Sequence, residues 1–289
     1  MPSSNASAVA VLTRAGRPRI AAVPTARPTV SVVIPTLNEE KNLPHVLAGL
    51  PDGIDEVIVV DGHSTDDTIG VVRRMRPDAR IISQTRRGKG NALACGFDAA
   101  LGDIIVMIDA DGSTDPAEIP RFVAALLAGS DFAKGSRFIA GGGSDDITPV
   151  RRLGNRFLNG LVNLVFDTRY TDLCYGYNAF WRDCLADMQL DAGARPAAAA
   201  EADRAMHWGD GFEIETIINV RVARAGLRIA EVASFEQPRL HGESNLSAVR
   251  DGLRVLRSIA TEWLRPDAPP RRPALAPSSP FPELELRAG

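Results

Sequence analysis

The sequence has little of what marks secreted, membrane-spanning or polyanion-binding proteins. Its 289 residues contain three cysteines, Cys95, Cys174 and Cys184, and their spacing fits neither a disulfide framework nor a zinc site. No stretch reaches the roughly 20 apolar residues that a membrane-spanning helix needs, and the apolar run at residues 8–12 is too short for a signal-peptide core. The formal net charge is −3, which gives no overall attraction to nucleic acid or anionic lipid. We therefore expect a cytoplasmic protein without a nucleic-acid partner.

The composition that remains is that of an ordinary globular protein, with 45% hydrophobic and 24% charged residues. Residues 1–28 and the Pro-rich residues 266–289 lack periodicity and are predicted to be disordered tails. Between them we expect one domain at residues 29–245, followed by an amphipathic helix at residues 246–265.

Short apolar runs alternate with helical patterns in the first half of this domain. Strands are predicted at residues 30–34, 57–60, 80–83, 104–108 and 131–133, and helices at residues 39–49, 66–76, 89–101 and 117–128. The second half is predicted to hold helices at 148–166, 212–225 and 246–264, strands at 174–181 and 228–235, and an alanine-rich surface insertion at 192–209. This alternation predicts an α/β fold with a mostly parallel central sheet flanked by helices. Ligands of such sheets bind at the carboxyl ends of the strands.

The first two predicted strands both run into polar residues. The first ends in PTLNEE (residues 35–40) and the second in DGHSTDDT (residues 61–68). Ser64 or Thr65 could simply cap the next helix. Asp61, at the strand end, is poorly placed for capping, and its carboxylate suits the donor hydrogens of a nucleobase or ribose.

The third predicted helix opens with RGKGN (residues 87–91). Glycines allow backbone amides to approach an anion, and a helix N-terminus attracts negative charge. Lys89 is therefore a candidate phosphate ligand. The spacing is not that of a Walker A loop, so the pattern alone does not specify a nucleotide site.

Two carboxylates separated by one residue follow the very apolar fourth strand, in MIDADGS (residues 107–113). In extended chain, residues i and i+2 point to the same side, so Asp109 and Asp111 converge on either side of Ala110. Such carboxylates repel each other unless a cation lies between them. Mg²⁺ or Mn²⁺ is the natural partner, and the ion can bridge a diphosphate leaving group. The alternative is a turn acid and a cap for the next helix.

Two arginines follow the next strand and the glycine-rich loop at residues 140–149. Arg137 lies in GSRF (residues 135–138), and Arg151 lies just beyond the loop, whose composition is typical of a mobile lid. The guanidinium fork suits phosphate oxygens. The alternative is that both arginines are solvated at the surface.

The order of the motifs PxxNE, VDGxSxD, GKG, DAD and GSR resembles that of family 2 glycosyltransferases of the GT-A fold. Within that family the chain looks most like the dolichol- or polyprenyl-phosphate sugar transferases, over about residues 30–264. The resemblance implies a single Rossmann-like domain. It also implies metal-dependent, inverting transfer of a hexose from a GDP- or UDP-sugar to an acceptor, with polyprenyl phosphate as the expected acceptor.

The resemblance also assigns roles to individual positions. The residues expected to line the nucleotide pocket are Pro35, Asn38, Glu39, Asp61 and Ser64. Asp109 and Asp111 are implied to hold the metal, with Ser113 as a further polar contact. Arg137 and Arg151 resemble arginines that bind an acceptor phosphate. The segment at residues 239–246, with Arg239 and His241, resembles the final motif that closes on the donor diphosphate.

The chain departs from the family pattern at two positions. Many relatives have a second acid after Asp61, where this chain has Gly62. The final motif has Asn245 in place of the usual lysine, which weakens a phosphate role for that position.

Three further acids are candidates for a catalytic base. Transfer to a hydroxyl needs a base, and Glu213 or Glu215 could serve, although both could also be acids on a helix face. Asp172 aligns with a conspicuous acid of the prenyl-phosphate branch and is an equal candidate. A lipid phosphate is already an anion and needs no base.

The last predicted helix carries an apolar stripe beside a basic one. The apolar residues are Val249, Leu253, Leu256, Ala260 and Trp263, and the basic residues are Arg250, Arg254 and Arg257. A basic amphipathic helix with a tryptophan is typical of a membrane interface, which would place the protein at the inner face of the membrane. Alternatively, the apolar stripe packs on the domain.

Three other functions stay open at this point. The acceptor could be a soluble or polysaccharide hydroxyl. A sugar-phosphate nucleotidyltransferase would want a glycine-rich loop with Arg and Lys after the first strand, which residues 35–40 lack. A non-catalytic nucleotide-sugar binder is disfavoured because Asp109 and Asp111 are both present.

Overall fold

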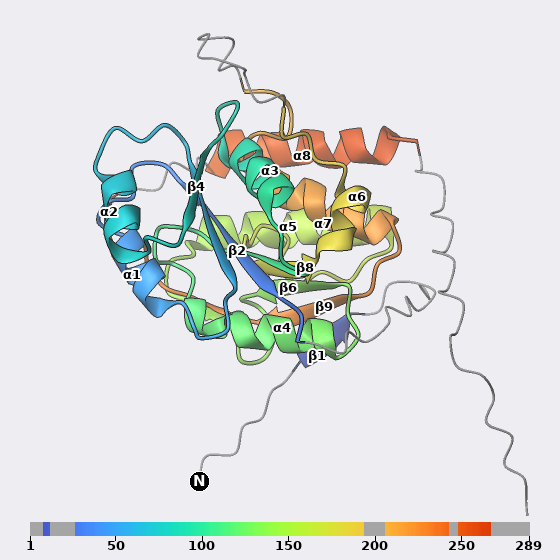
Figure 1. Cartoon of the computed structure of the whole chain (residues 1–289). Coiled ribbons are helices and arrows are strands. Elements are labelled where there is room, and N and C mark those ends of the chain that lie inside the picture. The colour runs from blue at the N-terminus through green and yellow to red at the C-terminus, as the bar shows by residue number, and fades with distance from the viewer. Residues whose placement is uncertain (1–7, 12–26, 194–205, 243–247, 267–289) are drawn as a thin grey trace, which may run out of the picture.

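The central element of the computed structural model is an eight-stranded sheet with the strand order β1-β9-β6-β8-β5-β2-β3-β4 (Figure 1). The structure describes residues 8–11, 27–193, 206–242 and 248–266. The strands are β1 (Ala8–Val11), β2 (Val30–Thr36), β3 (Glu56–Asp61), β4 (Arg80–Ser83), β5 (Ile104–Met107), β6 (Phe132–Ser136), β8 (Asn178–Trp181) and β9 (Ile229–Ala233). A separate parallel pair joins β7 (Gly143–Ser144) to β10 (Phe235–Glu236).

The sheet is mostly parallel, as the sequence predicts. Strands β5, β2, β3 and β4 run parallel to one another, and β6 is parallel to β9. Strand β8 is antiparallel to both of its neighbours, β5 and β6. Because β2, β3 and β5 are almost wholly buried, their side chains meet helices on both faces, which explains their continuous Val and Ile runs.

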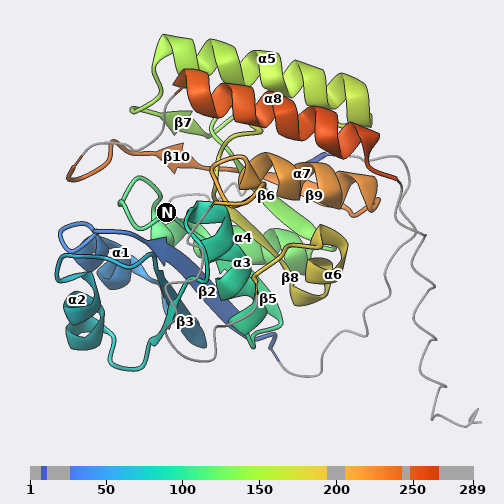
Figure 2. The same ribbon diagram turned by 90° about the horizontal axis from the view of Figure 1, so that it is seen from above.

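Helices cover both faces of the sheet, and one face carries more of them than the other. The helices are α1 (Leu43–Gly49), α2 (Thr68–Met75), α3 (Lys89–Ala99), α4 (Ile119–Leu127), α5 (Pro149–Phe166), α6 (Leu185–Met188), α7 (Ile214–Arg224) and α8 (Ala248–Leu264), with 3₁₀ turns η1 (Pro116–Glu118) and η2 (Arg182–Cys184). Residues of α1, α2 and α4 form one apolar core with one face of the sheet, and residues of α3, α5, α7 and α8 form the other. On that second face, α5 and α8 lie side by side as the outermost helices (Figure 2).

Two predicted elements differ from the structure, and a third lies mostly outside the described residues. Residues 8–11, predicted to belong to a disordered tail, form β1 antiparallel to β9; residues 1–7 and 12–26 lie outside the described residues, as do 267–289. The strand predicted at residues 174–181 begins only at Asn178, because the preceding residues form a loop tied to α5. Most of the insertion predicted at residues 192–209 lies outside the described residues.

Helix α8 is not a separate appendage to the domain. It packs against α7 and α5, and the guanidinium of Arg221 on α7 donates to the buried carboxylate of Glu262 on α8 at 2.8 Å. Among the described helices, none combines the length and the apolar character needed to cross a bilayer.

Candidate active site

The carboxyl ends of β2, β3 and β5 meet at one edge of the sheet. Strand β2 pairs with β3 on one side and with β5 on the other. The chain therefore places β3 and β4 on one side of β2 and then crosses to the other side to form β5, so the strand order reverses between β2 and β5. Ligands of open α/β sheets bind at such a reversal. Pro35 lies at the end of β2, and Asp109 and Asp111 follow β5. The structure thus brings the PTLNEE and DAD motifs to the same edge.

Polar side chains join the loops that follow β2 and β3. The Ser64 hydroxyl accepts the N–H of Asn38 at 2.9 Å, and the Asn38 side-chain oxygen accepts the N–H of Thr65 at 2.8 Å. The carboxylate of Asp61 accepts the N–H groups of His63 and Ser64, both at 3.1 Å. Asp61 does not cap a helix, since α2 begins only at Thr68; its carboxylate instead holds the turn after β3.

Arg239 connects the final motif to both the PTLNEE and the DAD loops. Its guanidinium donates to Glu39 at 2.6 Å and lies 3.4 Å from Asp111. Asn42 donates to the backbone oxygen of His241 at 3.0 Å, so His241 is anchored here through its main chain. Burial raises the pKa of Glu39, and the hydrogen bonds from Asn42 and Arg239 only partly oppose this shift. The described part of the final motif, residues 239–242, therefore lies against the metal-binding candidates, and its closure on the donor diphosphate stays a prediction.

Each acid of the DAD motif faces a cation. The ammonium of Lys89 lies 2.6 Å from Asp109 and 2.7 Å from Glu215, while Asp111 faces Arg239. Burial lowers the pKa of Lys89, but the carboxylates of Asp109 and Glu215 outweigh burial and hold it above its ordinary value. The Ser113 hydroxyl donates to Asp111 at 2.7 Å. Lys89 therefore lies beside the DAD motif and is not part of a separate anion-binding loop.

The oxygen atoms of this cluster fit a hard divalent ion. In the part of the chain that the structure describes, no three His, Cys, Asp or Glu side chains form a metal cage. Asp109, Asp111 and Ser113 offer only oxygen ligands, which favours Mg²⁺ or Mn²⁺ over softer metals. An ion held by one or two carboxylates completes its coordination with water and substrate phosphates.

The glycines around Lys89 serve close packing rather than anion binding. A Cβ atom on Gly90 would lie 2.0 Å from the backbone oxygen of Gly209, and the Gly90 N–H donates to the backbone oxygen of Asp210 at 2.7 Å. Arg86 adds two side-chain bonds to Asp210, both at 2.8 Å. The start of α3 is therefore locked against the turn that precedes α7.

That turn positions the two glutamates that the sequence singles out. One oxygen of Glu213 accepts the N–H groups of Gly209 and Gly211, and Glu215 pairs with Lys89. Both glutamates are buried at the start of α7, so neither is an exposed surface acid. Burial raises the pKa of Glu215, whereas the charge of Lys89 lowers it and only partly compensates.

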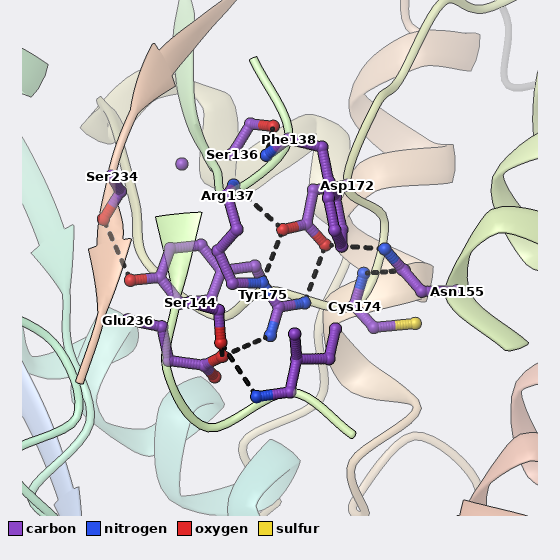
Figure 3. A network of polar contacts seen from close by, with 12 residues as sticks. Ser136, Arg137, Phe138, Ser144, Asn155, Asp172, Cys174, Tyr175, Ser234 and Glu236 are labelled. Carbon is purple, nitrogen blue, oxygen red and sulfur yellow. Dashed lines mark hydrogen bonds and ion pairs between the residues drawn. The ribbon is translucent and has the colours of Figure 1, made fainter. Parts of the chain in front are cut away.

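A second buried cluster centres on Arg137 (Figure 3). Its guanidinium makes a two-point contact with Asp172, at 2.7 and 2.8 Å, and donates to Glu236 at 2.9 Å. Asn155 of α5 donates to the same Asp172 carboxylate at 3.0 Å, and the ring of Tyr175 lies 4.8 Å from the guanidinium carbon. Burial opposes the charge on Asp172, but the bonds from Arg137 prevail and hold its pKa below the ordinary range.

This geometry favours a structural role for two of the expected site residues. Asp172 is fully buried and both of its oxygens accept hydrogen bonds from Arg137 and Asn155, so neither oxygen is free for a substrate proton in this arrangement. The fork of Arg137 is filled by carboxylates rather than open to a phosphate. Arg151 is different, since it is only partly buried and pairs with Asp146, which is also partly buried, at 2.7 Å.

Sequence reasoning missed three buried charges that build these clusters. Glu236 and Asp210 lie 99 and 124 residues from their arginine partners, so no local pattern joins them. Lys134 is fully buried in β6, and its ammonium donates to the backbone oxygen of Tyr175 at 2.6 Å. Burial lowers the pKa of Lys134. A lysine within the apolar run of β6 is the one signal that could have drawn attention to it.

Comparison with known proteins places this site in a family. Residues 31–188, more than half of the chain, match the model of glycosyl transferase family 2. The chain belongs to glycosyl transferase family 2. The expected GT-A fold and glycosyltransferase activity are thereby confirmed, and a nucleotidyltransferase or a non-catalytic binder is no longer an alternative.

Individual relatives of this family 2 glycosyltransferase differ in their acceptors. The chain is 30% identical to the glycosyltransferase AglJ of Haloferax volcanii over 77% of this chain and 68% of that protein. It is 31% identical to the undecaprenyl-phosphate mannosyltransferase of Micrococcus luteus over 81% and 93%. The glucosyl-3-phosphoglycerate synthase of Mycobacterium tuberculosis, solved with Mn²⁺, UDP-glucose and phosphoglyceric acid, superimposes with a TM-score of 0.62 at 26% identity, covering 83% of this chain and 81% of that one.

Proposed function

We propose that this glycosyltransferase moves a hexose from a nucleoside diphosphate sugar to polyprenyl phosphate, with Mg²⁺ or Mn²⁺ and with inversion at the anomeric carbon. The observation that carries the lipid acceptor is the outward face of α5 and α8, described below. The similarity to an undecaprenyl-phosphate mannosyltransferase supports the same acceptor.

The donor side of the proposal rests on the edge between β2 and β5. Asp109, Asp111 and Ser113 would hold the ion, which supplies electrostatic stabilisation of the departing nucleoside diphosphate. Lys89 and Arg239 add positive charge beside the same carboxylates.

The loops after β2 and β3 would bind the nucleoside. Pro35, Asn38, Glu39, Asp61 and Ser64 remain the residues proposed to line that pocket. The related synthase structures hold UDP with Mn²⁺ or Mg²⁺, which supports UDP as the nucleotide to test first and GDP as the second.

The outward face of α5 is unusually apolar. Four large hydrophobic side chains on it are between 62% and 83% exposed, namely Val150, Leu153, Phe157 and Leu164. They recur at spacings of three, four and seven residues, so they form one stripe along the helix. A contiguous exposed stripe of this kind marks an interaction surface rather than scattered surface residues.

Helix α8 extends this apolar face. Leu253 and Trp263 are more than 60% exposed, whereas the buried side of the helix contains Val255 and Ile259. The predicted apolar stripe therefore faces outward at Leu253, Ala260 and Trp263, whereas its Leu256 is partly buried and packs against the core; Val249 lies outside the described side chains. Most of the stripe points away from the domain because α8 covers α7 with its other side.

The charges on the two helices complement an anionic lipid surface. Helix α5 contains no Asp or Glu, and both acids of α8, Asp251 and Glu262, are buried. The arginines exposed on these helices are Arg152, Arg156, Arg250 and Arg257. Apolar side chains flanked by arginine, with no exposed acid, suit contact with the headgroup region of an anionic bilayer. We propose that this face holds the enzyme at the membrane that carries its acceptor.

The face is connected directly to the site. Asn155 of α5 binds the Asp172 carboxylate. Helix α8 begins at Ala248, nine residues after Arg239 of the final motif, and Arg239 contacts Asp111. An acceptor phosphate presented at the start of these helices would therefore be near the carboxylate pair. Arg151, at the start of α5, remains a candidate to meet it.

A donor and acceptor screen tests the proposal. The purified full chain would be incubated with Mn²⁺, UDP- or GDP-hexoses and either polyprenyl phosphate in neutral-lipid vesicles or soluble hydroxyl acceptors. We expect nucleoside diphosphate release that depends on polyprenyl phosphate, and a lipid-linked hexose detected by mass spectrometry. Turnover with soluble acceptors alone would overturn the lipid acceptor.

One observation favours a second candidate, transfer to a soluble hydroxyl. Glu213 and Glu215 are buried beside the site, and burial raises the pKa of Glu215, which is a property of general bases. A lipid phosphate would not need such a base. In that case Glu215→Gln should abolish turnover with soluble acceptors.

A further inference from the structure

Most carboxylate oxygens of the DAD motif are engaged by other groups of the protein. One oxygen of Asp109 pairs with the Lys89 ammonium at 2.6 Å. One oxygen of Asp111 accepts the N–H and the hydroxyl of Ser113, at 3.0 and 2.7 Å, and the other lies 3.4 Å from the Arg239 guanidinium. Three of the four oxygens proposed to hold the metal therefore have a partner, and two of them face a positive charge.

The position of Lys89 does not serve the stability of the helix that carries it. Lys89 is the first residue of α3, and a helix N-terminus disfavours a positive charge. The partners of its ammonium come from other segments, since Asp109 follows β5 and Glu215 lies in α7, 126 residues from Lys89. The Lys89 side chain is only 14% exposed. The tertiary structure therefore places this cation between two carboxylates of the site.

The surrounding packing holds Lys89 and Glu215 together. The Gly90 N–H donates to the backbone oxygen of Asp210 at 2.7 Å and fixes the start of α3. On another side, a Cβ atom on Gly176 would lie 3.0 Å from the Lys89 ammonium and 2.7 Å from the Glu215 carboxylate. Because Glu215 pairs with the ammonium at 2.7 Å, Lys89 keeps a carboxylate partner when its contact with Asp109 is broken.

A divalent ion that binds Asp109 in the absence of nucleotide meets an opposing charge. Like charges a few ångströms apart repel each other strongly at a partly buried site, so the Lys89 ammonium competes with the ion for this carboxylate. A nucleoside diphosphate changes the balance for two reasons. Its phosphate oxygens offer the ammonium a new anionic partner, and they complete the coordination of the ion.

We propose that Lys89 couples metal binding to nucleotide binding. Its ammonium competes with the ion for Asp109 in the free enzyme and pairs with the diphosphate when the donor is bound, while Glu215 keeps it at the site. The ion then enters with the donor and leaves with the nucleoside diphosphate product. This inference rests on the proposed function only in that the ion and the donor diphosphate share this edge of the sheet, and it holds for either kind of acceptor.

Mn²⁺ binding to the full chain without nucleotide, measured by electron paramagnetic resonance, tests the competition. We expect Lys89→Gln to tighten Mn²⁺ binding by about tenfold or more, because it removes the charge beside Asp109. The double variant Lys89→Gln/Glu215→Gln leaves the net charge unchanged and should also bind Mn²⁺ more tightly than the wild type, since the ammonium is the nearer of the two charges. Arg87→Gln is the matched control, because it removes one positive charge from an exposed side chain two residues away; it should bind Mn²⁺ as the wild type does.

Two results would overturn the competition. One is an unchanged or weaker Mn²⁺ affinity in the Lys89 variants, which would mean that Lys89 supports Asp109 as a ligand. The other is an equal gain in Arg87→Gln, which would mean that only net charge matters. Melting temperatures show whether each variant is folded, and the double variant decides the question if Lys89→Gln alone is not.

Calorimetric titration of UDP and GDP with and without Mn²⁺ measures the coupling. The factor by which Mn²⁺ tightens nucleotide binding equals the factor by which the nucleotide tightens Mn²⁺ binding, and we expect it to fall by about tenfold or more in Lys89→Gln. A wild-type factor in Lys89→Gln, or a wild type in which neither nucleotide shows any coupling, would refute the proposal.

The fate of the proposed function is read separately, from transfer to polyprenyl phosphate. A coupling that depends on Lys89, in an enzyme without such transfer, would refute the lipid acceptor and leave the role of Lys89 intact. Transfer to polyprenyl phosphate by an enzyme whose coupling is the same in Lys89→Gln would refute the role of Lys89 and leave the proposed function intact.

Discussion

Replacing Asp172 by asparagine distinguishes a structural role of this acid from a role as the catalytic base. The change keeps the size of the side chain but leaves the buried Arg137 guanidinium with Glu236 as its only carboxylate partner among the contacts described. Breaking a buried pair by removing one partner typically costs about 3–5 kcal/mol. Because Glu236 still offsets part of the charge, we expect the lower end, about 3 kcal/mol. For a domain of this size that lowers the melting temperature by about 6–12 °C.

The size of this loss should depend on pH in a defined direction. The pKa of Asp172 is held below its ordinary value of 3.8 in the folded protein, since Arg137 stabilises the charged form more than burial opposes it. The stabilisation by the pair is therefore fully present above about pH 4 and is lost as the pH falls through the lowered pKa. The difference in unfolding free energy between the wild type and Asp172→Asn should shrink correspondingly in acid.

Urea denaturation of four proteins provides the assay: wild type, Asp172→Asn, Arg137→Gln and the double variant. If the two side chains act as a pair, the double variant should be more stable than the sum of the single losses predicts, by at least about 1 kcal/mol. An Asp172→Asn protein with wild-type stability and a kcat reduced by orders of magnitude would refute this reasoning. Asp172 would then act on the substrate as a base.

Three further outcomes are expected. Asp111→Asn removes a metal ligand at constant size and should lower kcat by at least about 100-fold; full turnover in excess EDTA would contradict a metal role. Gly176→Ala places a Cβ 2.7 Å from the Glu215 carboxylate and 3.0 Å from the Lys89 ammonium, so it should lower kcat through displacement of that pair, whereas wild-type kinetics would show that the pair can shift freely. Phe157→Glu and Trp263→Glu should reduce flotation on anionic vesicles without lowering the melting temperature, because both side chains are exposed; equal flotation of wild type and variants would contradict membrane contact through α5 and α8.

Salt provides a control for the membrane prediction. Capture by vesicles through exposed arginines is screened by added salt, so wild-type flotation should fall between low and high ionic strength. Vesicles of neutral lipid should capture less protein at every salt concentration. Capture that does not change with salt or lipid charge would leave only the apolar part of the face to explain it.

The sequence by itself determined the features that depend on neighbouring residues. The apolar run of β5 predicted a buried strand with Asp109 and Asp111 directly after it, because strand periodicity is a local property. The convergence of the two carboxylates stays a prediction, since β5 ends at Met107 and each acid contacts a different cation. The alternation of apolar runs and helical patterns predicted the parallel sheet and therefore the edge at which the motifs meet. The order of the motifs was sufficient to identify the family.

Only the tertiary structure decided which charges are satisfied by which partners. The fork of Arg137 looks open in the sequence because its carboxylates lie 35 and 99 residues away. Helix α8 shows a related limit. Its periodicity reveals an apolar and a polar side, but the side that is covered depends on what α7 and α5 present to it. Arg221 on α7 draws Glu262 inward, so the domain buries the side of α8 that carries this acid and leaves Leu253 and Trp263 facing outward.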